Sequence, residues 1–278
     1  LTKPGVQALL FVSCISGMLI GSKFSPPLSI FIFGLLGISF LAASAAVINH
    51  IFDSEIDAKM NRTSSRPLVK GSITEFSASI FAAVLYISGS LMLLVYVNAL
   101  TWILTSLTFI FYAFIYTRYL KFMTSQNIVI GGLAGAMPPL LGWTAVSNTI
   151  EPNAWLLVLI VMVWTPPHFW ALAVYRVDDY AEAAVPMLPV QKGVAFTKQH
   201  IVLYTLLLLA STMLPYAVGM FQELYLVAAL ILGLGFLYFS IKLYRDDTNA
   251  SAMQTFAYSI SYLAALFGAM LVDQYLYL

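Results

Sequence analysis

Nine long apolar runs fill almost the whole chain. A membrane-spanning helix needs about 20 mostly apolar residues. The segments that meet this length are 5–22, 27–50, 76–97, 99–117, 127–147, 153–175, 200–219, 222–243 and 255–275. The runs are continuous rather than alternating, which argues against the strands of a membrane barrel. Only 9% of the 278 residues are charged, against about 25% in an average soluble domain. The sequence therefore predicts an all-α, polytopic membrane protein, with one nine-helix domain over residues 1–278.

The basic residues predict how the spans are oriented. With the N-terminus inside, twelve of the thirteen Lys and Arg residues fall on inner segments, and Lys23 falls outside. Such residues concentrate on the cytoplasmic side, so we expect a cytoplasmic N-terminus and a periplasmic C-terminus. The compact chain favours a bacterial inner membrane, with a mitochondrial membrane as the alternative. Two long cytoplasmic loops, near 51–75 and 176–199, hold most of the polar chemistry. Since the chain begins at Leu1 rather than Met, we also expect a short preceding segment.

The first of these loops begins with a spacing that suits a divalent cation. Asn49, Asp53 and Asp57 are four residues apart, so on a helix they share one face. We call these three residues the oxygen stripe. Mg²⁺ typically takes one or two carboxylates and completes its coordination with water and substrate phosphates. We therefore interpret the oxygen stripe as catalytic and as a Mg²⁺ site; a solvated loop is the alternative, and it is favoured for Glu55 and Lys59.

Basic side chains near the oxygen stripe are candidates for binding a diphosphate. A metal leaves part of the phosphate charge unneutralised, and Arg and Lys complement it. The candidates are Arg62, Arg66, Lys70, Arg118 and Lys121. For Arg118 and Lys121 the sequence leaves open a purely topological role at the inner end of the fourth span.

Sequence around the oxygen stripe carries a family resemblance. The residues are Asn49-x3-Asp53-x3-Asp57, followed by Asn61-Arg62-Thr63 and Arg66-Pro67-Leu68. They resemble the first aspartate-rich motif of the UbiA family of intramembrane prenyltransferases. The resemblance implies a bundle of nine transmembrane helices that binds a prenyl diphosphate through Mg²⁺ at this motif. The chain departs from the pattern at His50, where Asn is expected, and at Glu55, where Asp is usual.

Further blocks resemble one branch of this family, the haem O synthases. The blocks are 166–173 (Pro-Pro-His-Phe-Trp-Ala-Leu-Ala), 185–190 (Val-Pro-Met-Leu-Pro-Val), 125–143 and 258–273. The resemblance implies transfer of a farnesyl group from farnesyl diphosphate to a vinyl group of haem b, giving haem O. Both compounds are then substrates, and Mg²⁺ is the cofactor. Expected partners are the lipid bilayer and a downstream haem A synthase or oxidase assembly, and no nucleic acid is expected.

The second inner loop holds acids whose roles stay open. Members of the family carry a second D-x3-D motif, which is degenerate in this sequence. Asp178 and Asp179 are adjacent, and Glu182 is the acid that restores the four-residue spacing. We interpret Asp178 and Asp179 as catalytic and Asp178 as a metal ligand, with Glu182 as a further candidate ligand.

Candidates for haem contact lie just before these acids. They are His168, Tyr175 and Arg176. For His168 the alternative is a hydrogen bond between helices, where the neighbouring prolines free backbone carbonyls. Small residues at 131, 132, 135 and 136 predict close helix packing, with room for a flat porphyrin as the alternative.

Two other functions compete with haem farnesylation. One is a UbiA-type polyprenyltransferase acting on a quinone-precursor aromatic acid, and the Pro-His-Phe-Trp block argues against it. The other is a membrane transporter, since many proteins with several spans carry solutes. Against transport, the acids cluster at one membrane face, and no pair of broken helices appears in matching positions of the two halves.

Overall fold

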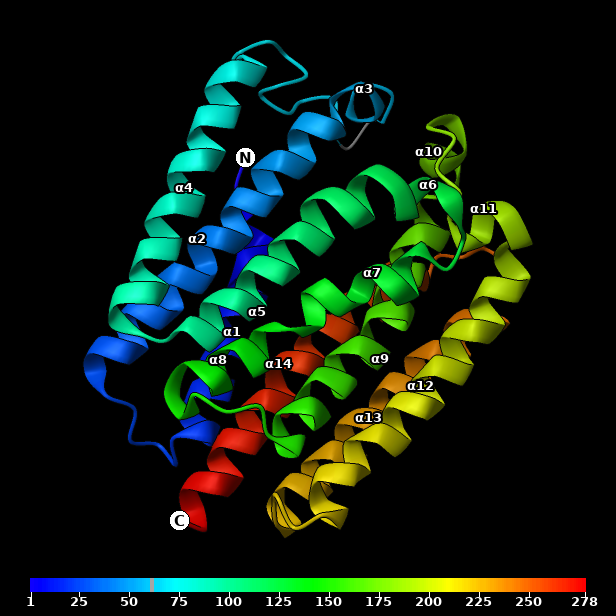
Figure 1. Cartoon of the computed structure of the whole chain (residues 1–278). Helices are drawn as coiled ribbons and strands as arrows, with labels where there is room; N and C mark the ends of the chain where they lie inside the picture. Colours follow the sequence, from blue (N-terminus) through cyan, green and yellow to red (C-terminus); the bar gives the residue numbers. More distant parts are fainter. Residues whose placement is uncertain (61–62) are drawn as a thin grey trace.

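The helices of the protein follow the apolar runs of its sequence (Figure 1). The computed structural model describes residues 1–60 and 63–278, where all regular structure is helical and nine spans are long and apolar enough to cross a membrane. The spans are α1 (Pro4–Gly21), α2 (Leu28–Phe52), α4 (Glu75–Tyr96), α5 (Ala99–Ile110) with its continuation to Met123, α7 (Asn127–Ala136) with α8 (Pro138–Ser147), α9 (Pro152–Tyr175), α12 (Val194–Ala217), α13 (Glu223–Arg245) and α14 (Ala252–Leu276). The predicted all-α bundle is confirmed.

Short helices gather at one end of the bundle. They are α3 (Ser54–Asp57), α6 (Lys121–Met123), α10 (Val177–Glu182) and α11 (Leu188–Lys192). Figure 1 shows all of them at the end opposite the C-terminus. Polar residues from distant parts of the sequence therefore share this end, and the two long loops are partly helical.

Two spans extend six residues beyond one end of their predicted ranges. The fourth continues from α5 through a π-helix, Phe111–Leu120, and ends with α6. The seventh begins at Val194, six residues before the predicted start at 200. Its first turns contain Lys198, which is buried and donates a hydrogen bond to the backbone carbonyl of Asp246. A charged side chain with such a partner can lie in a helix end that hydropathy alone does not include.

Asp246 also joins the neighbouring helices at this end. Its carboxylate accepts hydrogen bonds from the backbone N–H groups of Ser251, at 2.7 Å, and Thr248, at 2.9 Å. Hydrogen bonds from Ser251 and Thr248 hold the pKa of Asp246 well below its usual range. The carboxylate is therefore ionised at neutral pH and satisfies backbone donors at the start of α14.

Spans five and six form the centre of the bundle. In their most apolar 18-residue stretches, 72% and 67% of the residues are buried, against 22% in the fourth span. Span five is interrupted between Ala136 and Pro138, where α7 ends and α8 begins. The interruption follows from Pro138 and Pro139, which have no backbone N–H to continue the helix.

Backbones of α1 and α8 lie in direct contact. A Cβ built on Gly17 would lie 2.0 Å from the carbonyl oxygen of Pro139, and one built on Gly142 would lie 2.1 Å from that of Cys14. Small residues allow this close approach of helices within a membrane. The contact holds α1, and with it the N-terminal residues, against the centre of the bundle.

We expect Gly142→Ala to destabilise the protein by about 1–3 kcal/mol, because an added methyl group must push the two helices apart. Gly268→Ala in α14 is the matched control, since nothing lies within 4 Å of a Cβ built at that position. Thermal unfolding of the two variants in detergent measures the difference. Equal stability of both variants would contradict the packing described.

Candidate active site

The oxygen stripe is buried where α2 passes into α3. The exposed fractions of Asn49, Asp53 and Asp57 are 3%, 5% and 4%. Although α2 ends at Phe52, the N–H of Asp57 bonds to the carbonyl of Asp53 at 2.8 Å, so the helical spacing continues. Asn49 Nδ2 donates to Asp53 Oδ2 at 3.0 Å. Three oxygen-donor side chains thus line up below the protein surface.

A cationic side chain holds each member of the oxygen stripe. The pairs are Lys3 with Asn49 Oδ1, Lys121 with Asp53 Oδ2 at 2.8 Å, and Arg66 with Asp57 Oδ2. These cations come from the N-terminal residues, from the C-terminal end of the fourth span and from the first loop. Three partly buried cations thus surround two buried carboxylates, so the site is already rich in positive charge before any ligand binds.

Two other predicted bases, Arg118 and Lys70, are exposed at the protein surface. The guanidinium of Arg118 lies over the ring of Phe52, 5.3 Å from the ring centroid. Arg62 lies outside the described residues. Arg66 and Lys121 are therefore the predicted bases that the described structure brings into contact with the stripe.

The π-helix places Thr117 on the oxygen stripe. Asn49 Nδ2 donates to Thr117 Oγ1 at 3.1 Å. Thr117 Oγ1 in turn donates to the carbonyl of Tyr112 at 2.7 Å, five residues back. Such wider turns are rare and are frequently found at functional sites. Both amide hydrogens of Asn49 therefore face Asp53 and Thr117, and its single acceptor atom, Oδ1, faces Lys3.

Sequence reasoning did not identify Lys3 and Thr117 as parts of this site. In the sequence, Lys3 indicates only membrane orientation, and Thr117 belongs to no motif. Each is far from Asn49 along the chain, by 46 and 68 residues. No helical spacing relates residues so distant, so only the packing of α1, α2 and the fourth span could show them.

The chemistry of the oxygen stripe fits a magnesium ion. Its donors are carboxylate and amide oxygens, which hard cations prefer. Asp53 Oδ1 is buried and has no hydrogen-bond partner among the described residues. In the same residues, no group of three or more His, Cys, Asp and Glu side chains could hold a metal. Such a site needs further ligands from water or substrate phosphate, as is usual for Mg²⁺.

Two of the three acids of the second loop lie on the exposed face of α10, whereas only 14% of the Asp179 side chain is exposed. Asp178 and Glu182 are exposed, whereas Tyr180 and Ala183 on the opposite face are buried. Asp179 forms an ion pair with Arg176 at 3.4 Å. In the described structure these acids do not join Asp53 and Asp57 in a metal cluster.

The two loops nevertheless lie at the same end of the bundle, as Figure 1 shows for α3 and α10. The predicted role of the second-loop acids as metal ligands stays a prediction.

His168 forms a link between helices. Its Nδ1 lies 2.6 Å from Ser259 Oγ of α14. Its ring stacks on Trp164 and on Phe256, with centroid distances of 4.2 and 4.5 Å. Trp164 Nε1 donates to the carbonyl of Ser259 at 2.8 Å. These contacts favour the structural alternative for His168 over contact with haem.

Of the other haem candidates, Tyr175 is exposed and Arg176 is partly buried. The guanidinium of Arg176 lies 5.1 Å from the centre of the Tyr175 ring. Both therefore lie beside α10, at the end of the bundle that holds the short helices, where an anionic group on a second substrate could reach them. Their contact with haem also stays a prediction.

Small residues of α7 have two different roles. Cβ atoms built on Gly131 and Gly132 would lie 2.3 Å from the Tyr116 ring and 3.0 Å from Thr165, so both positions serve close packing. Nothing lies within 4 Å of a Cβ built on Gly135. Gly135 instead lines a cavity.

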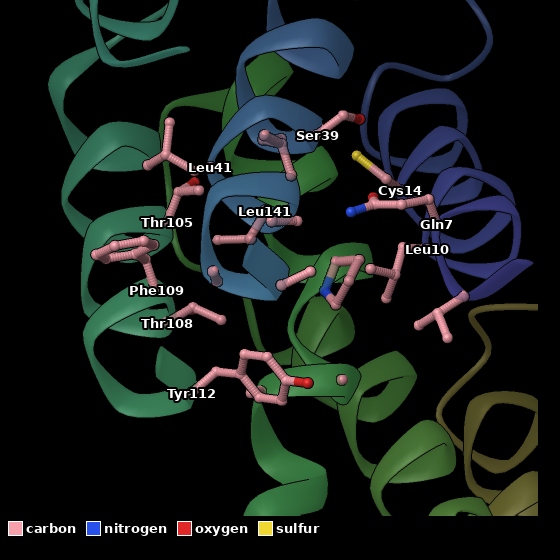
Figure 2. A pocket seen from close by; sticks show the side chains of 18 of the residues that line it. Gln7, Leu10, Cys14, Ser39, Leu41, Thr105, Thr108, Phe109, Tyr112 and Leu141 are labelled. Atoms are coloured by element: carbon pink, nitrogen blue, oxygen red, sulfur yellow. The ribbon is translucent and has the colours of Figure 1, made fainter. Parts of the chain in front are cut away.

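This cavity lies between α1, α2, the fourth span, α7 and α8; its empty volume of about 830 Å³ includes space that is open to the surroundings. Its lining is mainly aliphatic and aromatic, and we call it the apolar cavity. In Figure 2, Leu10 and Cys14 of α1 face Thr105 and Phe109 of α5 across the cavity. Lys3 and Tyr112 belong to its lining, and Lys3 also contacts Asn49. The cavity therefore begins beside the oxygen stripe.

The depth of the apolar cavity follows from α2. Ile38 and Leu41 line it, and Asn49 lies eleven residues after Ile38 on the same helix. At about 1.5 Å per residue, that separation is about 16 Å. An extended chain of about thirteen C–C bonds, which zigzags and advances about 1.2 Å per bond, spans a similar distance. The site can hold a long apolar chain whose charged end lies on the oxygen stripe.

Known proteins are similar to this chain in sequence, and others are similar to it in fold. The model of the UbiA prenyltransferase family matches residues 10–267. A protein of Saccharophagus degradans named protoheme IX farnesyltransferase is 52% identical over 276 residues, which cover 99% of this chain and 91% of that protein. A second, from Alcanivorax borkumensis and of the same name, is 53% identical over 278 residues, with 99% and 92% covered.

A solved structure has a similar fold. The UbiA homologue of Archaeoglobus fulgidus, bound to DMAPP and Mg²⁺, superposes with a TM-score of 0.65 at 13% identity and covers 95% of this chain and 97% of that chain. At this identity the likeness shows the fold alone. Family model, full-length relatives and fold agree with the geometry of the site. The chain belongs to the UbiA prenyltransferase family, and it is a prenyltransferase.

Proposed function

We propose that this protein transfers a farnesyl group from farnesyl diphosphate to a vinyl group of haem b, forming haem O. The observation that carries the proposal is the junction of the oxygen stripe with the apolar cavity, which suits a substrate with a charged head and a long apolar chain. The name shared by relatives at 52–53% identity specifies haem b as acceptor.

Asn49, Asp53 and Asp57 would hold Mg²⁺ at this junction. When bound, the metal neutralises diphosphate charge and so makes the diphosphate a better leaving group. Lys121 and Arg66, which pair with Asp53 and Asp57, would bind phosphate oxygens once the metal occupies the carboxylates. Arg62, Lys70 and Arg118 remain candidates for the same role.

The apolar cavity would hold the farnesyl chain away from water. Its wall excludes a competing nucleophile while the allylic cation forms. The C–O bond breaks with its electron pair going to the diphosphate, and the vinyl π electrons form the new C–C bond. Water then adds to the resulting cation and releases a proton, which gives the hydroxyethylfarnesyl group.

We place the acceptor at the inner end of the bundle. Tyr175 and Arg176 are candidates for a haem propionate, and Asp178, Asp179 and Glu182 for a second metal. In this arrangement the N-terminus is cytoplasmic, the C-terminus is periplasmic and the membrane is a bacterial inner membrane. Haem O would pass to a haem A synthase or to oxidase assembly.

Purified protein given haem b, farnesyl diphosphate and Mg²⁺ should form haem O, detected by mass spectrometry. Chelating divalent cations with EDTA should lower the rate by at least about 10³-fold, since metal and bases together stabilise the leaving group, and added Mg²⁺ should restore it. Prenylation of 4-hydroxybenzoate in place of haem b would contradict the acceptor, and full activity in EDTA would contradict the metal site.

A further inference from the structure

Lys3 lies at the boundary between the oxygen stripe and the apolar cavity. Its ammonium donates hydrogen bonds to Asn49 Oδ1 and, at 3.3 Å, to the hydroxyl of Tyr112. The same side chain lines the cavity, and it alone is charged among the described residues that do so. Tyr112 also lines this cavity, and Figure 2 shows its side chain in the wall. One cation therefore touches both parts of the site.

Lys3 donates a hydrogen bond to the only side-chain atom of Asn49 that can bind a metal. The amide nitrogen of Asn49 is already directed at Asp53 and Thr117, so the amide cannot turn over without losing both contacts. Its Oδ1 is the remaining acceptor, and it accepts from Lys3. An ammonium group and a metal ion cannot share this oxygen closely, because like charges repel. A metal that binds Asn49 must therefore displace Lys3.

The ammonium group of Lys3, once displaced, can bind the substrate where the apolar cavity meets the oxygen stripe. Lys121 and Arg66 hold Asp53 and Asp57, and neither base lines the apolar cavity. In a bound prenyl diphosphate, the bond that breaks joins the apolar chain to the diphosphate. It must lie where the cavity meets the oxygen stripe. Lys3 reaches this point through a flexible four-carbon side chain.

We propose that Lys3 is a catalytic residue that exchanges partners during turnover. In the ligand-free protein its ammonium binds Asn49; when metal and prenyl diphosphate arrive, it moves to the oxygens of the phosphate joined to the prenyl chain. As the C–O bond breaks, the diphosphate leaves with the electron pair, and Lys3 stabilises the added charge without transferring a proton. This inference rests on the proposed function only for its donor, a prenyl diphosphate.

The exchange predicts opposite changes in two affinities of Lys3→Met. Mn²⁺, used as a probe in place of Mg²⁺ and followed by the EPR signal of the free ion, should bind more tightly without diphosphate, because its competitor for Asn49 is gone. Farnesyl thiolodiphosphate, an analogue that ionises very slowly, should bind about tenfold more weakly by calorimetry with Mg²⁺, as expected for one lost charged contact. The turnover number should fall about 10²–10³-fold.

Two further variants separate this role from a structural one. Lys3→Arg keeps the charge and should recover most of the analogue affinity. Lys59→Met removes an exposed lysine of the first loop and should change neither affinity. A lysine that merely clamps Asn49 would, when removed, weaken Mn²⁺ binding as well. An Mn²⁺ affinity that does not rise, or an analogue affinity within twofold of wild type, would overturn the proposal.

The two ligand titrations do not depend on the acceptor. If haem b is not the substrate, wild-type protein will form no haem O, yet Mn²⁺ and the farnesyl analogue will still report on Lys3. If haem b is the substrate and Lys3 is only structural, haem O will form in wild type and the two affinities will fall together in Lys3→Met. Failure of the inference and failure of the proposed function are thus distinguishable.

Discussion

Asp53→Ala is expected to lower the rate of haem O formation by at least about 10³-fold, and Asp57→Ala to do the same. Each change removes a carboxylate from the oxygen stripe and leaves a partly buried cation, Lys121 or Arg66, without its ionic partner. Both the metal and the orientation of the bases are then lost. The measurement is the initial rate with saturating haem b and farnesyl diphosphate.

Glu55→Ala is the matched control for this loss. Glu55 lies on α3 with Asp57 but is exposed, so its removal should leave the rate within about twofold of wild type, as is usual for surface positions. The content of inserted, folded protein is checked by size-exclusion chromatography in detergent. Near-normal rates for Asp53→Ala and Asp57→Ala together would remove the basis for a metal site on the oxygen stripe.

Gly135→Leu is expected to raise the KM for farnesyl diphosphate by about 100-fold. Nothing lies within 4 Å of a Cβ built at this position, and Gly135 lines the apolar cavity, so a leucine side chain there would fill part of that cavity. Its added carbons displace part of the farnesyl chain, and each CH₂ group kept from burial costs about 0.8 kcal/mol. Loss of about 3 kcal/mol corresponds to roughly two orders of magnitude in affinity.

The control for this variant is Gly268→Leu. Gly268 is also helical, and a Cβ built there likewise meets nothing within 4 Å, but it lies away from the cavity lining. Its KM should stay near that of wild type. A shorter donor, geranyl diphosphate, should lose less affinity than farnesyl diphosphate in Gly135→Leu. An unchanged KM for both donors would show that the farnesyl chain lies elsewhere.

The sequence was sufficient where the governing forces act locally. Apolar runs of span length must become helices in a membrane, because unpaired backbone groups are too costly there. The paired prolines at 138 and 139 interrupt the fifth span for an equally local reason. The four-residue spacing places Asn49 next to Asp53, as their 3.0 Å hydrogen bond confirms. Each of these features depends on neighbours within a few turns of one helix.

The sequence was less informative where side-chain partners decide the outcome. Hydropathy predicts the start of the seventh span six residues too late, because the charged Lys198 lowers the hydropathy of the first turns. Its partner, the carbonyl of Asp246, is 48 residues away and cannot be inferred from the sequence. In the sequence, His168 is compatible with haem contact or with a link between helices. Its contact with Ser259 favours the link. The sequence does not show which side of α10 faces the protein. The burial of Tyr180 and Ala183 decides this, and with it the exposure of the acids.

By itself, the sequence determined that this protein is a helical membrane bundle with three aligned oxygen donors at one end. Only the tertiary structure decided what faces those donors. Packing of α1 on α8 brings Lys3 to Asn49, and the wider turn of the π-helix brings Thr117 to the same amide. The physical reason is distance along the chain: helix periodicity relates residues a turn or two apart, whereas contacts across 46 or 68 residues arise only when whole helices pack.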